Sequence, residues 1–472
     1  MNTLAQRPNQ TAREAARLPT KDSKRAREGE RPREPGRTSN KWTWTTLTNI
    51  VERTDYGITA SADFAKTGPR LLRITDIQDG KVDWTKVPGC AISTTDAAEN
   101  ALLDGDIVFA RTGATTGKSY LIRDPPDAVC ASYLIRLRPK SDVCSEYLSL
   151  FFQSEYYWKQ IHGKVRGGAQ PNFNASMLAV LDVPLPPLPT QRRIAAELKL
   201  QLAEVDRARA ALQAQLEAAK ALPAASLRAV FGDAARGDAR PPSKDSARNR
   251  EGERLHAAIS PTEEKELCLH NSATKWIRIR DLAETCSGTT PSRGTQEFYG
   301  GSIPWVKTGE LRDDVITETE EHVTEEALRR SSLRLLLKGT LLIAMYGQGQ
   351  TRGRTGLLGC PATTNQACFA ILPNPQFDPE FMQFWFRASY QRLRTQTEGR
   401  GGNQPNLSGE LLNQELVPLP PLPVQRTLAA KLRSEITAAT DLRTRLEARL
   451  ATLDRLPAAL LRQVFGDHEG GC

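Results

Sequence analysis

The chain contains a long internal repeat. Residues 167–233 align with residues 401–467 without a gap, at an offset of 234, and 32 of the 67 aligned pairs are identical. The shared landmarks are Gln-Pro-Asn, the run Pro-Leu-Pro-Pro-Leu-Pro, a Gln that follows it, and a closing Val-Phe-Gly-Asp. Residues 21–31 also match residues 244–254 at nine of eleven positions. The chain is therefore expected to fold as two similar units in tandem.

Between the matched ends, at residues 41–165 and 275–399, the similarity falls to scattered glycines, tryptophans and apolar positions. Each of these stretches is predicted to be α/β, with apolar strand-like runs and one aromatic helix. The expected strands are residues 71–77, 106–110, 303–307 and 340–345, and the expected helices are residues 146–162 and 379–393. The aromatic triplets 156–158 and 384–386 are expected in the core. The repeated prolines cannot continue a strand or helix, so they predict a rigid exit from each unit.

A heptad pattern follows each proline run and predicts a helix of about 50 Å over residues 190–222. Both copies interrupt the apolar seam with an arginine at the same position. The seam residues are Leu198, Leu202, Val205, Arg209, Leu212, Leu216, Leu432, Ile436, Arg443, Leu446, Leu450 and Leu453. We expect the two helices to form an antiparallel coiled coil with each other. The alternative is that each helix lies against its own domain.

Net charge alone does not indicate a nucleic-acid partner. The chain carries a formal net charge of +9, but residues 1–40 and 234–256 hold +7 of it, and both segments have a composition typical of disorder. Any DNA-binding surface on the folded remainder must therefore be local.

The cysteines, the length of the apolar runs and the lack of a catalytic set limit the classes of protein to which this chain can belong. None of the eight cysteines forms a C-x2-C pair and the five histidines are scattered, so no metal site is expected. No apolar run is long enough to span a bilayer, so a cytoplasmic protein without membrane contact is expected. No set of nucleophile, base and orienting residue can be assembled. We therefore expect a chain that is not an enzyme.

The ordered motifs resemble those of the type I restriction–modification specificity subunits. Residues 287–293 (SGTTPSR) and 299–305 (YGGSIPW) are similar to the start of that family's recognition domain, and residues 55–60 and 72–80 resemble another variant of it. The segment 105–113, the Gln-Pro-Asn loop and the Pro-Pro-Leu-Pro-x-Gln exit are also similar to family landmarks. The family usually has Glu before that Gln, where this chain has Thr190 and Val424.

The resemblance implies two α/β target-recognition domains, each followed by a spacer helix. The expected boundaries are a basic leader at 1–40, recognition domain 1 at 41–189, helix 1 at 190–233, a basic linker at 234–274, recognition domain 2 at 275–423, helix 2 at 424–467 and a tail at 468–472.

By the same resemblance, one copy of the chain would read a bipartite, asymmetric site in double-stranded DNA. Two modification subunits, which bind S-adenosylmethionine and methylate adenine, would join it, as would restriction subunits that use ATP. No cofactor is expected in this chain. Two alternatives stay open: a specificity subunit of a type IIB-like restriction–methylation enzyme, and a coiled-coil scaffold without a DNA role.

Two pairs of glycine-rich loops are the candidate DNA contacts. Residues 113–119 resemble a phosphate-binding P-loop but have three residues between the glycines where that motif has four. Arginine, glutamine, lysine and threonine side chains on flexible loops can bind bases or phosphates. The candidates are Arg111, Thr115, Thr116, Lys118, Lys164, Arg166, Gln348, Gln350, Arg352, Arg354, Arg394 and Arg400. The alternative is that these loops are ordinary solvent-exposed loops.

Overall fold

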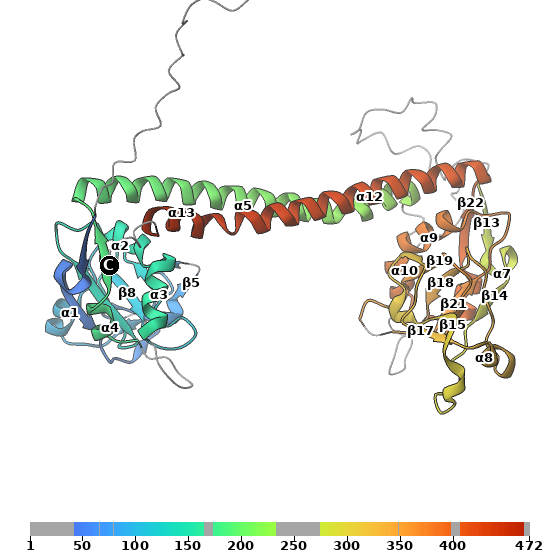
Figure 1. Ribbon diagram of the computed structural model, residues 1–472, viewed down its shortest axis with the longest axis horizontal. Helices are drawn as coiled ribbons and strands as arrows, with labels where there is room; N and C mark the ends of the chain where they lie inside the picture. Colours follow the sequence, from blue (N-terminus) through green and yellow to red (C-terminus); the bar gives the residue numbers. More distant parts are fainter. Residues whose placement is uncertain are drawn as a thin grey trace, which may run out of the picture. The chain divides into compact units, whose positions relative to one another are not determined.

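The computed structural model describes residues 42–65, 67–78, 80–164, 173–232, 274–347, 349–397 and 406–466. It separates into two compact units, residues 1–153 with 157–193 and residues 154–156 with 194–472. The first unit holds domain 1, which runs from strand β1 to strand β12. The second holds domain 2, from β13 to β22, together with nearly all of the two long helices (Figure 1). The expected leader, most of the linker and the tail lie outside the described residues.

Domain 1 is mixed α/β, with two four-stranded sheets in the orders β2-β11-β8-β9 and β10-β4-β7-β3. A two-stranded sheet, β1-β12, joins the start of the domain to its end, and β5-β6 is a short hairpin. The strands are β1 Thr43–Thr46, β2 Val51–Tyr56, β3 Ala62–Asp63, β4 Arg70–Leu72, β5 Ile77–Gln78, β6 Lys81–Val82, β7 Gly89–Cys90, β8 Ile107–Ala110, β9 Ser119–Leu121, β10 Ala128–Cys130, β11 Leu134–Pro139 and β12 Asp182–Leu185. The helices are α1 Thr94–Asn100, α2 Ser145–Phe151, α3 Glu155–Lys164 and α4 Ala175–Ala179.

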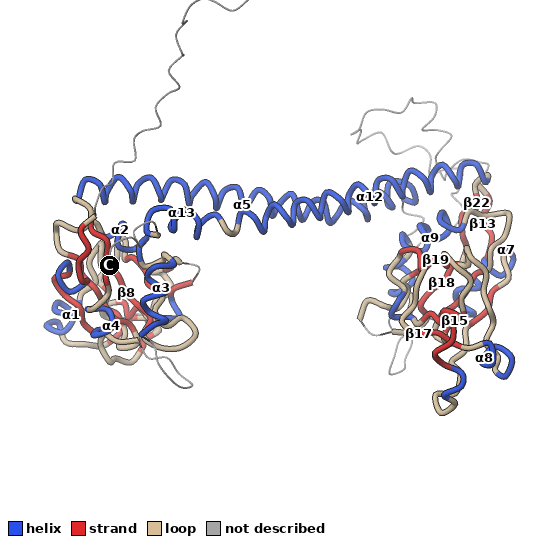
Figure 2. The backbone as a smooth tube through the Cα atoms, viewed as in Figure 1, coloured by secondary structure: helices blue, strands red, loops and turns tan. Residues whose placement is uncertain are grey.

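Domain 2 repeats this plan, although corresponding elements differ in length. Its sheets have the orders β14-β21-β18-β19-β16, β17-β15-β20 and β13-β22. The strands are β13 Lys275–Arg278, β14 Thr285–Ser287, β15 Tyr299–Val306, β16 Asp314–Ile316, β17 Glu321–Val323, β18 Leu341–Ala344, β19 Thr355–Leu358, β20 Thr363–Thr364, β21 Cys368–Ile371 and β22 Leu416–Leu419. The helices are α7 Ile279–Leu282, α8 Glu325–Arg330, α9 Pro379–Ala388, α10 Tyr390–Thr395 and α11 Gly409–Gln414. In both domains runs of short strands are separated by short helices (Figure 2).

The long helices are α5 Leu188–Phe231 and α12 Leu422–Leu453, and α13 Leu456–Phe465 follows α12. Within the second unit, α5 and α12 pack antiparallel and run side by side in Figure 1. Leu216, Ala219 and Leu446 form the buried centre of the contact, flanked by Leu212 and Leu450. This confirms the expected coiled coil for the middle of the seam, because burying these apolar side chains removes them from water. The expected seam residues Leu432 and Ile436 belong instead to the core cluster of domain 2.

The C-terminal end of α5 is part of the core of domain 2. Phe231 is only 1% exposed, and its ring lies 5.5 Å from that of Phe381 and 5.6 Å from that of Trp385. Leu227 belongs to the same cluster. The repeated Val-Phe-Gly-Asp therefore closes the first helix by placing an aromatic anchor on the second domain.

The repeated Gln residues have an equivalent structural role in each copy. In domain 1, the buried Gln191 accepts a hydrogen bond from the N–H of Cys144 at 2.9 Å and donates to the Pro186 carbonyl at 2.8 Å. Gln425 accepts from the N–H of Asp378 and donates to the Pro420 carbonyl, both at 2.8 Å. Each Gln thus joins the start of a long helix to the start of the aromatic helix.

Four sequence-based expectations were wrong in detail. Residues 71–77 are not one strand: β4 ends at Leu72 and a 3-10 turn, Ile74–Asp76, follows. The turn forms because the Asp76 carboxylate accepts the N–H of Arg73 at 2.9 Å and also binds its guanidinium.

The aromatic segments also differ from expectation, because each forms two helices, α2 with α3 and α9 with α10. Phe384, Trp385 and Phe386 are buried as expected, but of the first triplet only Tyr157 is fully buried. The prolines do not exclude regular structure either. Pro184 and Pro418 lie in the two-stranded sheets β1-β12 and β13-β22. Every strand of a two-stranded sheet is an edge strand, and an edge strand tolerates proline because one of its sides forms no hydrogen bonds within the sheet.

Candidate nucleic-acid interface

The first glycine hairpin, residues 110–119, connects β8 to β9. The Ala110 N–H donates to the Lys118 carbonyl at 2.9 Å, and the Gly117 N–H donates back to the Ala110 carbonyl at 2.8 Å. Gly113 and Gly117 have φ values of 83° and 82°, a left-handed conformation that favours glycine. The sequence pattern of glycines therefore encodes a tight hairpin with short polar residues between them.

The candidate residues of this hairpin are at least partly accessible. Lys118 is exposed, and Thr115 and Thr116 are half-buried. The Thr116 hydroxyl donates to the Gly113 carbonyl at 2.7 Å, which braces the tip. Lys118 is thus the member of this group whose side chain reaches solvent most freely.

Arg111 lies at the base of the first hairpin, against an aromatic ring. Its guanidinium carbon is 4.7 Å from the centroid of the Tyr56 ring, and Tyr56 is 41% exposed. The Arg111 N–H donates to the Tyr133 carbonyl, and its own carbonyl accepts from the N–H of Phe173, both at 3.0 Å. Three segments of domain 1 therefore meet at a half-buried arginine stacked on a partly exposed tyrosine.

The second glycine hairpin, residues 344–355, connects β18 to β19 and is two residues longer. It is closed by the same two backbone hydrogen bonds, here between Ala344 and Gly353 and between Ala344 and Arg354. The Tyr390 hydroxyl donates to the Gln350 carbonyl at 2.7 Å. The hairpin is thereby attached to α10.

Several candidate arginines of domain 2 hold this hairpin in place. Arg394 donates to the carbonyls of Gly349 and Arg352, at 2.9 and 3.1 Å. Arg354 is ion-paired with Asp313, and Arg352 is only 5% exposed. These side chains already have protein partners, so their first contribution is to the shape of the loop.

Four candidates lie partly or wholly outside the described residues. The backbone of Lys164 ends α3, but its side chain is not described, and Arg166, Gln348 and Arg400 fall outside the described ranges. Arg392, which neighbours the last of these loops, forms a buried ion pair with Glu415. The structure therefore places Arg111, Thr115 and Thr116 on one hairpin. The second pair of candidate loops, residues 159–170 and 392–404, lies only partly within the described residues.

A stacked group in domain 2 was not anticipated from the sequence. The Arg293 guanidinium carbon lies 4.7 Å from the centroid of Tyr299 and 5.0 Å from that of Trp305. Hydrogen bonds from Arg293 and then Lys307 lower the pKa of Glu321 to about 2. The signal was present in the motifs 287–293 and 299–305, but only folding places the arginine across the two rings.

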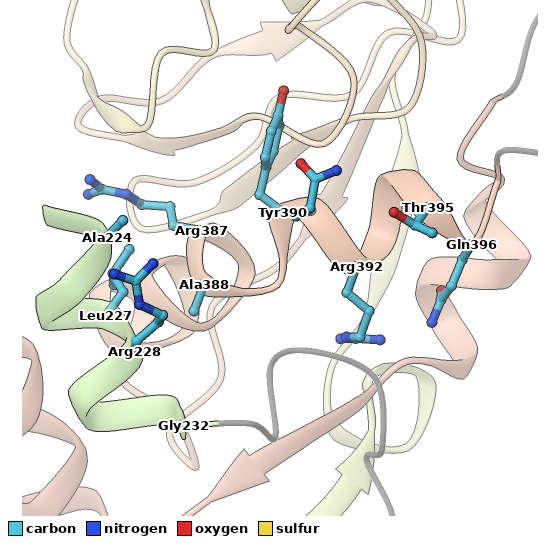
Figure 3. A pocket seen from close by; sticks show the side chains of 11 residues that line it. Ala224, Leu227, Arg228, Gly232, Arg387, Ala388, Tyr390, Arg392, Thr395 and Gln396 are labelled. Atoms are coloured by element: carbon cyan, nitrogen blue, oxygen red, sulfur yellow. The ribbon is translucent and has the colours of Figure 1, made fainter. Parts of the chain in front are cut away.

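A cavity of about 740 Å³ lies where the end of α5 meets α9 and α10 (Figure 3). Arg228 on α5 and Arg387 on α9 line it from different helices. Burial lowers the pKa of Arg387, and its guanidinium lies 5.2 Å from the Phe384 ring centroid. This gives the second unit a recessed, cation-lined surface next to the helix pair.

The described ranges hold neither a metal-binding cluster nor a membrane-spanning helix. Within them, no three or more His, Cys, Asp or Glu side chains are arranged to hold a metal ion. No helix in the same ranges has both the length and the apolar character that crossing a bilayer requires.

Two α/β domains of one repeated plan, with two paired helices that follow their proline exits, define a duplicated domain-and-spacer protein. The family model described as "Type I restriction modification DNA specificity domain" matches residues 61–218 and 271–452, well over half of the chain. The chain belongs to this family, and the resemblance seen in its sequence motifs is confirmed.

Individual relatives agree with this assignment. The chain is 27% identical over 213 residues to the type I restriction enzyme MjaIX specificity subunit of Methanocaldococcus jannaschii, a match that covers 44% of this chain and 48% of that protein. It is 22% identical over 433 residues to the EcoKI specificity subunit of Escherichia coli K12, covering 89% of this chain and 87% of that one. The chain thus spans about half the length of the first relative and most of the second.

A solved structure shows the same fold. The HsdS subunit from Thermoanaerobacter tengcongensis superimposes with a TM-score of 0.60 at 19% identity, covering 92% of this chain and 99% of that chain. At this identity the likeness establishes the shared architecture of two α/β domains and long helices.

Proposed function

We propose that this chain is the non-catalytic DNA-recognition subunit of a type I restriction–modification complex. Each domain reads one half of a bipartite site in double-stranded DNA, and the paired helices separate the halves. The observation that supports this most directly is the contrast within the repeat. The two hairpins share their backbone hydrogen bonds, but Arg111 of the first corresponds to the buried Met345 of the second. Different side chains on one scaffold favour two different half-sites.

The chemistry is proposed to reside on partner subunits. Modification subunits would bind S-adenosylmethionine and methylate adenine, and restriction subunits would use ATP. Within the described residues, the polar clusters are ion pairs and loop-bracing hydrogen bonds, as at Arg354–Asp313 and Arg392–Glu415. Such pairs supply structure and positioning.

Methylome sequencing tests the proposal. The full chain is expressed with the modification subunit in a host that lacks its own adenine methylation. The expected result is methyladenine at one bipartite motif whose two halves differ in sequence. A control without this chain should give no such motif. Methylation that does not depend on the chain would contradict the proposal.

Gel shifts separate this function from a coiled-coil scaffold. The complex should bind the mapped duplex more tightly than a scrambled duplex of equal length. Binding to the scrambled duplex should weaken steeply as salt rises, because it depends on phosphate contacts. A scaffold should bind neither duplex.

A further inference from the structure

Domain 1 has an open cavity of about 540 Å³, which we name the domain 1 cavity. Segments 58–62, 71–75 and 131–133 line it. Ile58, Ala60 and Ala62 contribute apolar surface, and Thr59, Thr75 and Ser132 contribute hydroxyl groups. Leu71 also lines the cavity and is itself only 2% exposed. The cavity therefore combines apolar walls with groups that can donate or accept hydrogen bonds.

Domain 2 has the same structural position, identified by strand register. In domain 1, the parallel pair β4–β10 places Leu71 opposite Val129. In domain 2, the parallel pair β15–β20 places Trp305 opposite Thr363. Both pairs are related by the repeat offset, so Trp305 is the counterpart of Leu71.

The neighbouring loop confirms the correspondence. The Ile58 N–H donates to the Cys130 carbonyl at 2.8 Å, and the Thr289 N–H donates to the Thr364 carbonyl at 2.8 Å. Counting along the loops from this pair of bonds makes Pro291 the counterpart of Ala60.

In domain 2 this space is filled by the protein's own aromatic rings. Trp305 is 1% exposed, and its indole N–H donates to the Thr289 carbonyl at 3.2 Å. The Tyr299 hydroxyl donates to the Pro291 carbonyl at 2.7 Å. The Arg293 guanidinium stacks across both rings. This position in the fold therefore accommodates planar groups, held by backbone carbonyls and stacked on one another.

Domain 1 offers the same position without the aromatic filling. Its rim carries Tyr133, which is 62% exposed, and Arg73, whose guanidinium carbon is 5.6 Å from the ring of the 71% exposed Phe64. Asp76 binds and orients Arg73. Of the described residues that line the cavity, none is acidic. Exposed aromatic rings interleaved with arginine suit stacking with a nucleobase next to a phosphate backbone.

The cavity adjoins the candidate DNA contacts. Tyr133 lines it, and the carbonyl of Tyr133 accepts the N–H of Arg111 at the base of the first glycine hairpin. A duplex held at that hairpin would thus bring a base within reach of the cavity.

We propose that the domain 1 cavity receives one unstacked base of the recognised DNA, which occupies the space that Trp305 and Tyr299 fill in domain 2. The inference rests on the proposed DNA-recognition function. Hydroxyl groups on the cavity wall read the edge of the base, and its faces lie against apolar side chains and the rim aromatics. Domain 2, whose space is already filled, receives no base at the corresponding position. Proteins that extrude a base offset the lost stacking with contacts of this kind.

The test transfers domain 2 residues into domain 1. Leu71→Trp introduces the residue found at the same position in domain 2 and fills the cavity. Leu103→Trp is the matched control, because Leu103 is 50% exposed and does not line the cavity. The complex of the full chain with the modification subunit is titrated with duplexes of the mapped site. Each duplex has a single abasic nucleotide at one position of either half.

The wild-type complex should lose about tenfold or more in affinity when one particular base is removed. Leu71→Trp should bind the intact duplex about as weakly, and it should show no further loss with that abasic duplex. Leu103→Trp should behave like the wild type. A folded Leu71→Trp complex with wild-type affinity, or with an unchanged pattern of abasic penalties, would overturn the proposal.

Ser132→Gln keeps the test decisive if Leu71→Trp does not fold. In domain 2 the corresponding Gln366 is hydrogen-bonded to Thr290, and Thr59 is present in domain 1 to make the same contact. This variant should remove the same abasic penalty, with a melting temperature near that of the wild type. If it leaves the penalty unchanged, the cavity does not hold the base. A wild-type complex that does not prefer the mapped duplex would instead refute the proposed function.

Discussion

The two glycine hairpins have the same backbone and use it differently. Arg111 of the first hairpin stacks on a partly exposed tyrosine, whereas its counterpart Met345 is buried. Lys118 is exposed, whereas its counterpart Arg354 is ion-paired with Asp313. The repeat therefore preserves where the loop lies and changes which side chains it presents. For a protein with two domains of one plan, this difference is what allows two distinct ligands.

The two long helices also share one arrangement and differ in their side chains, although the difference is smaller. Arg209 crosses the helix pair to Asp454 at 2.8 Å. The repeat offset makes Lys220 the counterpart of Asp454, so Arg443 has a cation at the corresponding place. Arg443 instead pairs with Glu447 on its own helix. The apolar seam is symmetric, but its charges are not.

The largest effect is expected from breaking the apolar seam that both copies share. Leu446→Asp buries a carboxylate where Leu446 is 4% exposed, which costs several kcal/mol or forces the helices apart. Methylation should be lost while circular dichroism shows both domains folded. Leu442→Asp is the control, because Leu442 is 43% exposed on the same helix. Wild-type methylation by Leu446→Asp would show that the pair is not the spacer.

The next largest effect, on the free energy of unfolding, is expected where α5 enters domain 2. Phe231→Ala removes a ring packed between Phe381 and Trp385 and should lower the free energy of unfolding of the second unit by about 3–5 kcal/mol. Leu222→Ala, at an exposed site on the same helix, should change it little. Chemical denaturation followed by tryptophan fluorescence measures the difference. Equal stabilities would mean that domain 2 does not depend on the first helix.

A substitution in the first hairpin should change DNA affinity without changing the stability of the protein. Arg111→Ala should weaken binding to DNA that carries one half-site by about 1–3 kcal/mol if Arg111 reads a base, with little change in melting temperature. Equal loss on every duplex would instead make Arg111 a phosphate contact. Competition titrations with each half-site scrambled in turn distinguish these outcomes.

In the second hairpin, Arg354→Ala should lower stability first and DNA affinity only as a consequence. Removing the partly buried pair with Asp313 should destabilise the second hairpin by about 1 kcal/mol, and DNA affinity should fall as a consequence of the altered loop. Arg354→Lys, which keeps the charge, should recover part of the stability. If Arg354→Ala weakens binding with no thermal change, Arg354 contacts DNA directly.

The smallest effects concern the asymmetric charges of the helix pair. Asp454→Lys should destabilise the pair by up to about 1 kcal/mol, because both partners are partly exposed and Arg209 would face a cation. Lys220→Asp should stabilise it slightly by giving Arg443 a partner across the seam. Melting temperatures at low and high salt measure both changes. Opposite signs would show that the helices do not pair in this register.

The repeated segments were the most predictable part of the fold. The heptads of Leu212, Leu216 and Leu446 were enough to expect two paired helices, because an apolar stripe must be covered. The candidate site was less predictable. Lys118 and Arg354 come from similar motifs, yet only the position of Asp313, far away in the sequence, makes one of them an internal ion pair.

By itself, the sequence determined the duplication, the α/β character of both domains, the helical spacers and the family. These features depend on local periodicity and on repeated motifs, which are visible in one dimension. Only the tertiary structure decided how identical motifs differ in outcome. The motif Leu-Pro-Ala-Ala lies inside the continuous helix α5 at Pro223, but it follows a break between α12 and α13 in the second copy. The tertiary structure likewise left a cavity beside Leu71 and filled its counterpart with Trp305. Such outcomes depend on contacts between residues distant in the chain, and local pattern does not contain them.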